Sequence, residues 1–345
     1  MKKILMTGGG SAGHVIPNLA LLPKLKEHYV VSYAGTHAIE YSLLKNKGIA
    51  FYSFSAPKLV RGSIRQNLTL PCRFFKSIRQ AKQILKTVQP DLVFSKGGYV
   101  SLPVVLAAKK LNIPVLSHES DYSAGLANKI IAKRCQLVLT SFPETAENLP
   151  NGKYSGSPVR EELFGADPAK ARQKYGFSGT KPVLLVFGGG SGSAAINRAL
   201  EQCLPTVLNT FDVLHIRGKN ENSPQFPGYV SKDFEQDMAS AYACADYVLS
   251  RSGSNTVFEI LALKKCALLV PLDNGRSRGD QVENARYFAE RGLCHVLQEK
   301  DLSPQTLQKA LKELADDHDL PVRLARAPFK NGNGIILAEI MSRLE

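Results

Sequence analysis

Short apolar runs alternate with longer stretches of helical pattern along almost the whole chain. Brief runs of this kind are typical of strands buried in a sheet. In the first part of the chain they fall at Lys3–Thr7, Val30–Ala34, Asp91–Ser95, Pro114–Ser117 and Leu137–Thr140. In the second part they fall at Val183–Phe187, Val213–Ile216, Tyr247–Ser250, Ala267–Val270 and Cys294–Leu297. Because helical segments separate most of these runs, the pattern predicts an α/β fold of parallel sheets with crossover helices.

A weak internal repeat indicates how these strands are divided. The segment Met6–Gly13 (MTGGGSAG) recurs in altered form as Val186–Ser193 (VFGGGSGS), and each copy follows a predicted strand and precedes a helix. With 345 residues, the chain is also too long for one ordinary core. We therefore predict two Rossmann-like, doubly wound domains over residues 1–160 and 161–332. A C-terminal helix over about residues 333–345 is expected to pack back on the first domain.

Composition limits the class of protein. With 44% hydrophobic and 21% charged residues, the chain has the make-up of a folded globular protein. No apolar run approaches the roughly 18 residues of a membrane-spanning helix, and Gly8 cuts short any signal-peptide core. The six cysteines form no C-x-x-C pair, so we expect small core residues in a reducing compartment rather than disulfides or a zinc site. These features predict a cytoplasmic protein.

The formal net charge of +14 is concentrated in one stretch. Between Tyr41 and Pro90 there are ten Lys or Arg and no Asp or Glu. A stretch of this kind suits nucleic acid, anionic lipid or a phosphorylated substrate. Sparse aromatic residues and the lack of any RNA- or DNA-binding motif disfavour nucleic acid.

Two patterns follow one another inside the basic stretch. The second has an apolar stripe at helical spacing, expected in the core: Phe74, Ile78, Ala81, Leu85 and Val88, with Lys76, Arg79, Lys82 and Lys86 facing the other way. The first interleaves apolar residues with arginines: Leu59, Val60, Ile64, Leu68 and Leu70, with Arg61 and Arg65. That mixture suits the headgroup boundary, where each basic residue adds about 1 kcal/mol near anionic lipid. We predict that the basic residues within 58–86 face an anionic membrane surface.

The first glycine loop matches the dinucleotide fingerprint, with Gly8, Gly10 and Gly13 in the G-x-G-x-x-G spacing. A dehydrogenase needs an acid at the end of the second strand to hold the ribose, but that strand ends in Tyr33–His37 without a carboxylate. Nicotinamide binding is therefore disfavoured.

His14 follows the loop where a helix begins, and a neutral imidazole there could take a proton from an attacking hydroxyl. A purely structural histidine is the alternative.

A second polar turn follows the predicted strand Tyr247–Ser250 and opens a helix over Arg251–Glu259. Its hydroxyl and amide donors suit a diphosphate, and the two oxygens of Glu259 match the vicinal diol of a ribose. The alternative is a capped helix with a solvated glutamate. Gln281 and Asn284 lie three residues apart, on one helical face, and could bind sugar hydroxyls. On these residues alone, the sugar-binding and structural interpretations are equally good.

Three further polar groups have less specific patterns. Arg160 lies at the expected domain junction, where it could reach a phosphate. The segment His118–Asp121 follows a predicted strand and so belongs to a carboxyl edge, where open α/β sheets bind ligands. Asp317–Asp319 has a D-x-D spacing known from metal sites, but it lies in an acidic helical tail, and we expect a solvated surface there.

Taken together, these residues resemble the MurG family, the UDP-N-acetylglucosamine transferases that complete lipid II in bacterial peptidoglycan synthesis. The likeness runs along the whole chain in a fixed order of motifs. These motifs are Gly8–His14, Lys96–Ser101 (KGGYVS), His118–Glu119, Gly125–Lys129 (GLANK), Gly156–Arg160, the second glycine loop, Arg251–Glu259 and Asp280–Ala285.

The resemblance implies two Rossmann-like domains facing a cleft, the GT-B type. It implies a metal-independent, inverting transferase without cofactors, which moves GlcNAc from UDP-GlcNAc to the 4-hydroxyl of undecaprenyl-diphospho-N-acetylmuramoyl-pentapeptide (lipid I). It also implies a peripheral location on the cytoplasmic face of the membrane, and leaves room for other cell-wall synthesis proteins as partners. No nucleic-acid partner is implied.

The resemblance also assigns roles residue by residue. Donor contacts are implied for Ser11, Ala12, Gly13, Gly190 and Ser191, and a phosphate contact for Arg160. The nucleotide would be lined by Ser254, Asn255, Thr256, Val257 and Phe258, with Glu259 on the ribose and Gln281 on the GlcNAc hydroxyls. His14 or Asp121 would take the proton, and the acceptor side would include Tyr99, His118 and Glu119.

Three positions depart from the family pattern. Ser11–Gly13 stands where better-known members have Thr-Gly-Gly, Asp121 where they have Asn, and Gly190 where they have Ser. We interpret these as marks of a divergent branch. The alternatives are a transferase acting on another glycolipid, a UDP-GlcNAc 2-epimerase on the same scaffold, or a catalytically inactive binding protein. The acid-free stretch argues against an epimerase, and the presence of His14 and Glu259 argues against an inactive relative.

Overall fold

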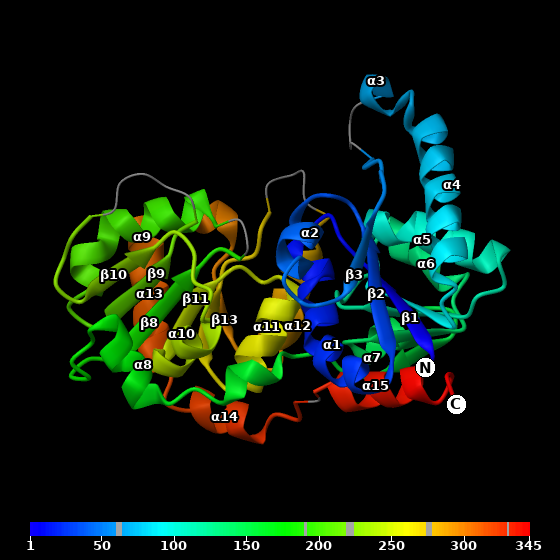
Figure 1. The fold of residues 1–345 in the computed structure, drawn as a ribbon. Helices are drawn as coiled ribbons and strands as arrows, with labels where there is room; N and C mark the ends of the chain where they lie inside the picture. Colours follow the sequence, from blue (N-terminus) through cyan, green and yellow to red (C-terminus); the bar gives the residue numbers. More distant parts are fainter. Residues whose placement is uncertain (60–63, 190–191, 219–223, 274–277, 330) are drawn as a thin grey trace. The chain divides into compact units, whose positions relative to one another are not determined.

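The protein is described by a computed structural model that covers residues 1–59, 64–189, 192–218, 224–273, 278–329 and 331–345 (Figure 1). The chain divides into two compact units. Unit 1 comprises Met1–Arg160 and Lys330–Glu345, and unit 2 comprises Glu161–Phe329. The sequence placed the corresponding divisions after residues 160 and 332.

Unit 1 is built on a seven-stranded sheet in which every described strand pair is parallel. Its strands are β1 (Lys3–Thr7), β2 (Val30–Gly35), β3 (Ala50–Ser53), β4 (Leu92–Ser95), β5 (Val115–Glu119), β6 (Leu137–Thr140) and β7 (Gly152–Tyr154). The spatial order is β3-β2-β1-β4-β5-β6-β7. The order therefore reverses between β1 and β4, and this reversal is the topological switch point of a doubly wound sheet.

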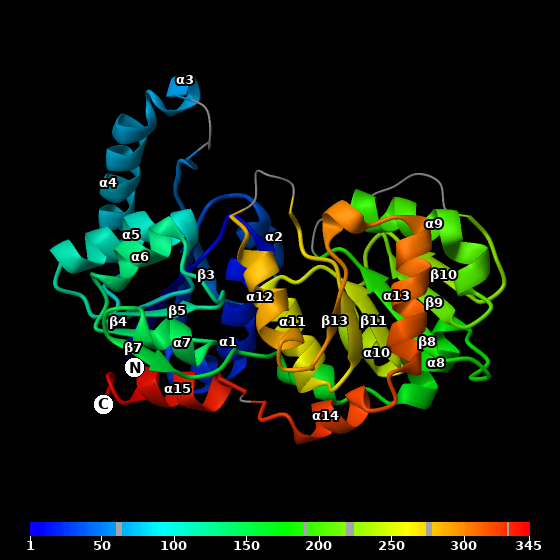
Figure 2. The same ribbon diagram turned by 180° about the vertical axis from the view of Figure 1, so that it is seen from behind.

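Helices cover both faces of this sheet (Figures 1 and 2). They are α1 (Ile16–His28), α2 (Ile39–Leu44), α3 (Ile64–Asn67), α4 (Leu70–Val88), α5 (Gly98–Lys110), α6 (Leu126–Ala132), α7 (Pro143–Glu147) and α15 (Asn333–Met341), with a short 3-10 helix η1 (Ala12–His14). Alternate strand residues supply two separate cores, as the period of two in a strand requires. Ile4 and Met6 pack with α1 and with Ile336 and Ile340 of α15, whereas Leu5 packs with α4 and α5.

Unit 2 repeats the architecture with a six-stranded parallel sheet. Its strands are β8 (Val183–Phe187), β9 (Asp212–Ile216), β10 (Tyr229–Lys232), β11 (Tyr247–Ser250), β12 (Cys266–Leu269) and β13 (His295–Val296), in the order β10-β9-β8-β11-β12-β13. Its helices are α8 (Pro168–Tyr175), α9 (Ala194–Val207), α10 (Met238–Cys244), α11 (Ser254–Ala262), α12 (Asp280–Ala289), α13 (Pro304–Asp316) and α14 (Leu320–Arg326), with 3-10 helices η2 (Glu161–Phe164) and η3 (Glu299–Asp301). The switch point lies between β8 and β11.

The predicted fold class is confirmed, since each of the ten predicted strands is present with ends shifted by at most two residues. Three strands were missed: β3, β7 and β10. Each is only three or four residues long and mostly part-exposed, so none has a continuous apolar run. One expectation about the cysteines was wrong: Cys72 on α4 is exposed, whereas the other five are buried.

Candidate active site

In unit 1 the first glycine loop leads directly from β1 into the turn that carries His14. Gly10 has a φ of +80°, and a side chain there would collide with the Tyr99 ring. Ser11 precedes η1 and its hydroxyl lies 3.0 Å from Nδ1 of His14. Nδ1 of His14 is therefore engaged by the Ser11 hydroxyl. His14 itself is partly exposed, as a proton acceptor must be.

The turn after β4 packs against His14. Gly98 has a φ of +79°, and a side chain there would meet the His14 ring at 3.1 Å. The Gly98 amide donates to Oδ1 of Asn128 at 2.8 Å, and Nδ2 of Asn128 donates to Glu119 at 2.6 Å. Asn128 of α6 therefore fixes the turn under His14 and the end of β5 at the same time. The predicted residues Tyr99, Glu119 and His14 are brought together around this network.

The end of β5 is more deeply buried than the sequence suggested. His118 is fully buried, and its Nε2 donates to the carbonyl of Gly156 at 3.1 Å. Burial, with the charge of Lys96, lowers the pKa of His118 well below 6.5. His118 is thus a neutral, buried group, which argues against direct contact with the acceptor. Burial also raises the pKa of Glu119, which accepts the amide of partly exposed Asp121 at 3.0 Å.

A lysine that the sequence analysis gave no role lies at the centre of this group. Lys96 follows β4, is 1% exposed, and donates from Nζ to the hydroxyl of Ser120. A buried ammonium is costly unless opposite charges compensate it, and the charges of Glu119 and Asp121 act on it here. Burial nevertheless lowers the pKa of Lys96 to about 8.

This pKa gives a pH prediction. Below pH 8 the Lys96 ammonium is charged and holds the Ser120–Asp121 turn, and above it the charge is lost, so kcat is expected to fall on the alkaline side. Lys96→Met should lower kcat about tenfold at pH 7 and abolish the alkaline decline near pH 8, measured as kcat against pH. Lys265→Met is the matched control, since burial also lowers the pKa of Lys265, in unit 2. An unchanged alkaline limb in Lys96→Met contradicts the assignment.

In unit 2 the turn after β11 delivers the predicted donor residues. Glu259, in the second turn of α11, is only 8% exposed and accepts the Tyr242 hydroxyl at 3.3 Å. A solvated glutamate on a capped helix is therefore excluded, and the N-cap, Gly253, has no capping side chain. A carboxylate held in place by a buried tyrosine is suited to bidentate recognition of a diol.

The other predicted nucleotide-binding residues of α11 differ in how far they are exposed. Asn255 and Thr256 are partly exposed, and Ser254 is 4% exposed. Val257 and Phe258 are buried, with the Phe258 ring packed edge-on at 5.4 Å against Phe288. A nucleotide would therefore meet these last two residues only through their main chain.

Three side chains form hydrogen bonds to the main chain of the segment after β12. Oε1 of Gln281 accepts the Leu272 amide at 3.0 Å, and the Gln281 carbonyl accepts the Ser252 hydroxyl at 2.8 Å. Arg251 donates to the Val270 carbonyl at 3.2 Å and forms an ion pair with Glu299. Glu299, which no sequence motif pointed to, also accepts the Asp273 amide at 2.8 Å.

The remaining predicted positions are placed less fully. Arg160 is partly exposed and is the last residue of unit 1 before unit 2 begins. Ala12 and Gly13 belong to η1 and are partly exposed. Gly190 and Ser191 lie outside the described residues.

The D-x-D spacing serves a structural purpose. Asp317 accepts from Nε2 of His295 at 2.9 Å and from Arg323 at 2.7 Å, and these bonds lower its pKa to about 2. His318 and Asp319 are exposed, as expected for a solvated surface, whereas Asp317 is only partly exposed and is held by these two bonds. Among the residues that the structure describes, no group of three or more His, Cys, Asp or Glu side chains could hold a metal ion.

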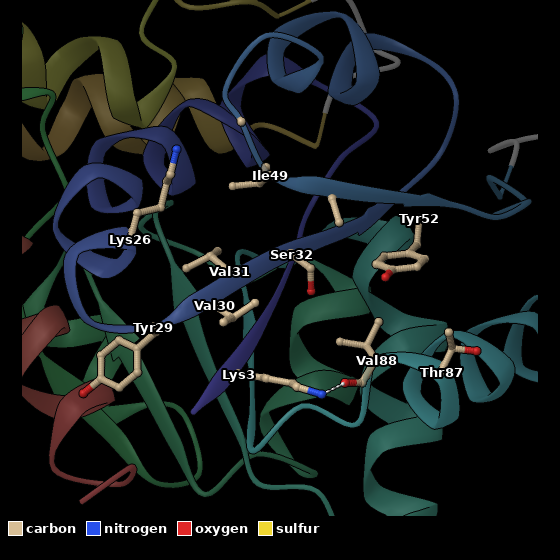
Figure 3. Close-up of a pocket in the computed structure, with 12 residues that line it drawn as sticks. Lys3, Lys26, Tyr29, Val30, Val31, Ser32, Ile49, Tyr52, Thr87 and Val88 are labelled. Carbon is tan, nitrogen blue, oxygen red and sulfur yellow. Dashed lines mark hydrogen bonds between the residues drawn. The ribbon is translucent and has the colours of Figure 1, made fainter. Parts of the chain in front are cut away.

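A pocket of about 430 Å³ lies at the opposite edge of the unit 1 sheet, at the amino ends of β1, β2 and β3 (Figure 3). The side chains of its two lysines, Lys3 and Lys26, point in different directions and do not converge on one ligand position. Lys3 donates to the Val88 carbonyl at 3.2 Å and Lys26 to the Lys47 carbonyl at 2.9 Å. Open α/β sheets bind ligands at the carboxyl ends of their strands, so the site belongs with the glycine loop and not with this pocket.

Comparison with known proteins identifies the family. Residues 4–140 match the glycosyltransferase family 28 N-terminal domain, and residues 183–335 match the C-terminal domain of that family. The chain is 44% identical over 336 residues to the UDP-N-acetylglucosamine–N-acetylmuramyl-(pentapeptide) pyrophosphoryl-undecaprenol N-acetylglucosamine transferase of Lachnospira eligens, covering 95% of each chain. It is 40% identical over 341 residues to the Clostridium botulinum (Loch Maree) enzyme of the same name, covering 96% of each. The chain belongs to the MurG family.

Solved structures agree with membership of the MurG family. Acinetobacter baumannii MurG superimposes with a TM-score of 0.74 at 25% identity, over 99% of this chain and 100% of that one. The calicheamicin glycosyltransferase CalG4 gives a TM-score of 0.74 at 18% identity, over 100% and 98% of the two chains, which shows a shared fold alone. The predicted GT-B class and the predicted glycosyltransferase activity are thus confirmed.

Proposed function

We propose that this protein transfers GlcNAc from UDP-GlcNAc to the 4-hydroxyl of the N-acetylmuramoyl residue of lipid I, giving lipid II. The observation that carries the proposal is the match to MurG-family enzymes along nearly the whole chain. The local geometry agrees with it: a partly exposed histidine on the glycine loop of unit 1, and a buried, oriented glutamate on α11 of unit 2.

Unit 2 supplies the donor site in this proposal. Glu259 accepts the two ribose hydroxyls, and the turn Ser252–Ser254 with the amino end of α11 faces the diphosphate, where main-chain amides favour anions. Gln281 binds the GlcNAc hydroxyls through its side-chain amide, whose oxygen also accepts the Leu272 amide. Arg160 contacts the diphosphate.

Unit 1 supplies the acceptor chemistry. The 4-hydroxyl attacks the anomeric carbon, its proton passes to Nε2 of His14, and the bond from the anomeric carbon to the UDP oxygen breaks. This single displacement inverts the anomeric configuration. Ser11 holds Nδ1 and so fixes the ring, and Asp121 is the second candidate for the proton. We propose that the reaction requires neither metal nor cofactor.

The acceptor carries an undecaprenyl chain, so the enzyme must bind it at a membrane surface. Helix α4 is the element best suited to contact that surface. Arg73, Lys76, Arg79, Lys82 and Lys86 are all exposed, while Ala81 and Leu85 are buried against unit 1. Phe75 and Leu68 are 69% and 72% exposed. None of the helices in the described ranges is long and apolar enough to cross a membrane. We propose peripheral binding at the cytoplasmic face through residues 58–86.

Vesicle binding tests this surface. Lys76→Glu with Arg79→Glu should weaken binding to vesicles containing anionic lipid at least tenfold, since each basic residue contributes about 1 kcal/mol. The control pair, Lys309→Glu with Lys312→Glu on α13, carries the same charge change on exposed residues of unit 2. Co-sedimentation measures both. An equal loss in both pairs shows only a net-charge effect and contradicts the assignment.

The transfer reaction itself is tested with purified protein, labelled UDP-GlcNAc and a short-chain lipid I analogue, in the presence of a metal chelator. We expect a β-1,4-linked disaccharide product. Transfer only after Mg²⁺ or Mn²⁺ is added contradicts metal independence. No transfer, with UDP-GlcNAc still bound, contradicts the acceptor and favours another glycolipid. Formation of the epimer of UDP-GlcNAc without any acceptor favours the epimerase.

A further inference from the structure

A carboxylate inside unit 1 accepts a main-chain amide of the first glycine loop. In nucleotide-binding glycine loops the main-chain amides after the first strand donate to the phosphate. Here the Gly10 amide donates to Oε1 of Glu40 at 3.1 Å. A Cβ atom at Gly9 would lie 1.9 Å from the same oxygen, so the carboxylate rests directly against the loop's main chain.

Glu40 is fixed and enclosed. It belongs to α2, next in the chain after β2, and is fully buried. Oε1 also accepts the Thr36 hydroxyl at 2.9 Å, while Oε2 is buried without a hydrogen-bond partner among the described residues. Burying a carboxylate costs free energy unless hydrogen bonds or opposite charges compensate it. The hydrogen bonds from Gly10 and Thr36 supply part of that compensation, so the position of Glu40 depends on the loop.

The loop that Glu40 holds is the one that carries His14. Gly10 is clamped between the Glu40 carboxylate and the Tyr99 ring, and Gly8 accepts the Tyr33 hydroxyl at 2.9 Å. The residue after Gly10 is Ser11, whose hydroxyl pairs with His14 Nδ1. A shift of Gly10 therefore moves Ser11 and turns the imidazole.

We propose that Glu40 is a positioning residue: its carboxyl oxygen accepts the Gly10 amide of the first glycine loop, as a phosphate oxygen would, and so holds Ser11 and His14 in the geometry for proton transfer. Its role in turnover rests on the proposed function, whereas its role in ordering the loop does not. One consequence concerns ligand binding: the Gly10 amide already donates to Glu40, so it does not bind the donor diphosphate.

The test separates positioning from folding and from donor binding. Glu40→Ala should lower kcat at least tenfold and leave KM for UDP-GlcNAc within twofold, because misplacing a catalytic group by about 1 Å can cost 100-fold. Glu40→Gln, whose amide oxygen still accepts from Gly10, should stay within threefold of wild type. Acetate, a small carboxylate, should restore part of the kcat of Glu40→Ala. Should Glu40→Ala not fold, Glu40→Asp, one methylene shorter, should show the same split.

A readout without turnover completes the test. The ring ¹⁵N signals of His14 in NMR spectra should shift in Glu40→Ala and not in Glu40→Gln. The control is Glu235→Ala: Glu235 is buried in unit 2 and accepts the Tyr175 hydroxyl at 3.1 Å and the Asp237 amide at 2.9 Å. It should lower Tm and leave kcat and the His14 signals unchanged.

Unchanged kcat in Glu40→Ala, or unchanged His14 signals, overturns the proposal. If the protein transfers no sugar at all, the proposed function fails, while the His14 signals still decide whether Glu40 orders the loop.

Discussion

Replacing His14 by alanine is expected to lower kcat by about 100- to 10,000-fold, the range that a positioned general base contributes. The imidazole is partly exposed at the carboxyl edge of β1, and Ser11 holds its Nδ1 at 3.0 Å. The affinity for UDP-GlcNAc, measured by calorimetry, should stay within twofold of wild type, because the proposed ribose and sugar contacts are in unit 2.

Two variants make the result specific. His28→Ala removes an exposed histidine at the far end of α1 and should leave kcat unchanged. Ser11→Ala leaves the imidazole but removes the partner of Nδ1, and should cost about tenfold in kcat. A normal kcat in His14→Ala would transfer the role of base to Asp121, for which Asp121→Asn is then the decisive variant.

Replacing Glu259 by alanine is expected to raise the Kd for UDP by about 150-fold or more. A hydrogen bond to a charged group contributes roughly 1.5–3 kcal/mol, and the proposed contact has two of them. Glu259 is 8% exposed and accepts the Tyr242 hydroxyl at 3.3 Å, which restricts its side chain before the ribose binds. Titration calorimetry with UDP measures the change.

A comparison of ligands tests the ribose assignment directly. The wild-type protein should bind 2′-deoxy-UDP at least tenfold more weakly than UDP, while Glu259→Ala should bind both alike. This double-mutant logic isolates the pair of groups. Glu290→Ala, on the exposed end of α12, is the control and should retain the discrimination. Equal discrimination in Glu259→Ala and wild type would remove Glu259 from the ribose.

Elements determined by local sequence were predicted, whereas contacts between residues far apart in the chain were not. Strands with continuous apolar runs, such as β1 and β8, were predicted with their observed ends. A strand that is buried on both faces of a sheet needs apolar residues at successive positions, so its own sequence shows where it lies. The edge strand β3 has no such run. Glu40 and Lys96 were missed as contributors to the site for a different reason: their partners, Gly10 and Ser120, lie 30 and 24 residues away in the chain.

The burial of His118 was not anticipated from its place in the sequence. Its place after a strand predicted a ligand contact, since polar residues at a carboxyl edge usually face the crevice. The structure instead buries the ring and ties it to Gly156. The alternation of apolar and polar residues does not show whether a polar residue is the last buried residue of a strand or the first exposed residue after the strand ends.

The course of the chain through unit 1 has a consequence for how the protein is made. Ile336, Ile340 and Leu344 complete the core that β1, β2 and α1 begin, and the whole of unit 2 is synthesised between those two contributions. On the ribosome, unit 2 can therefore become native while unit 1 still exposes an apolar face. The unit that carries His14 is completed last. A chain that terminates before about Ile336 should therefore contain a folded unit 2 and an incomplete unit 1, whose exposed apolar face binds chaperones.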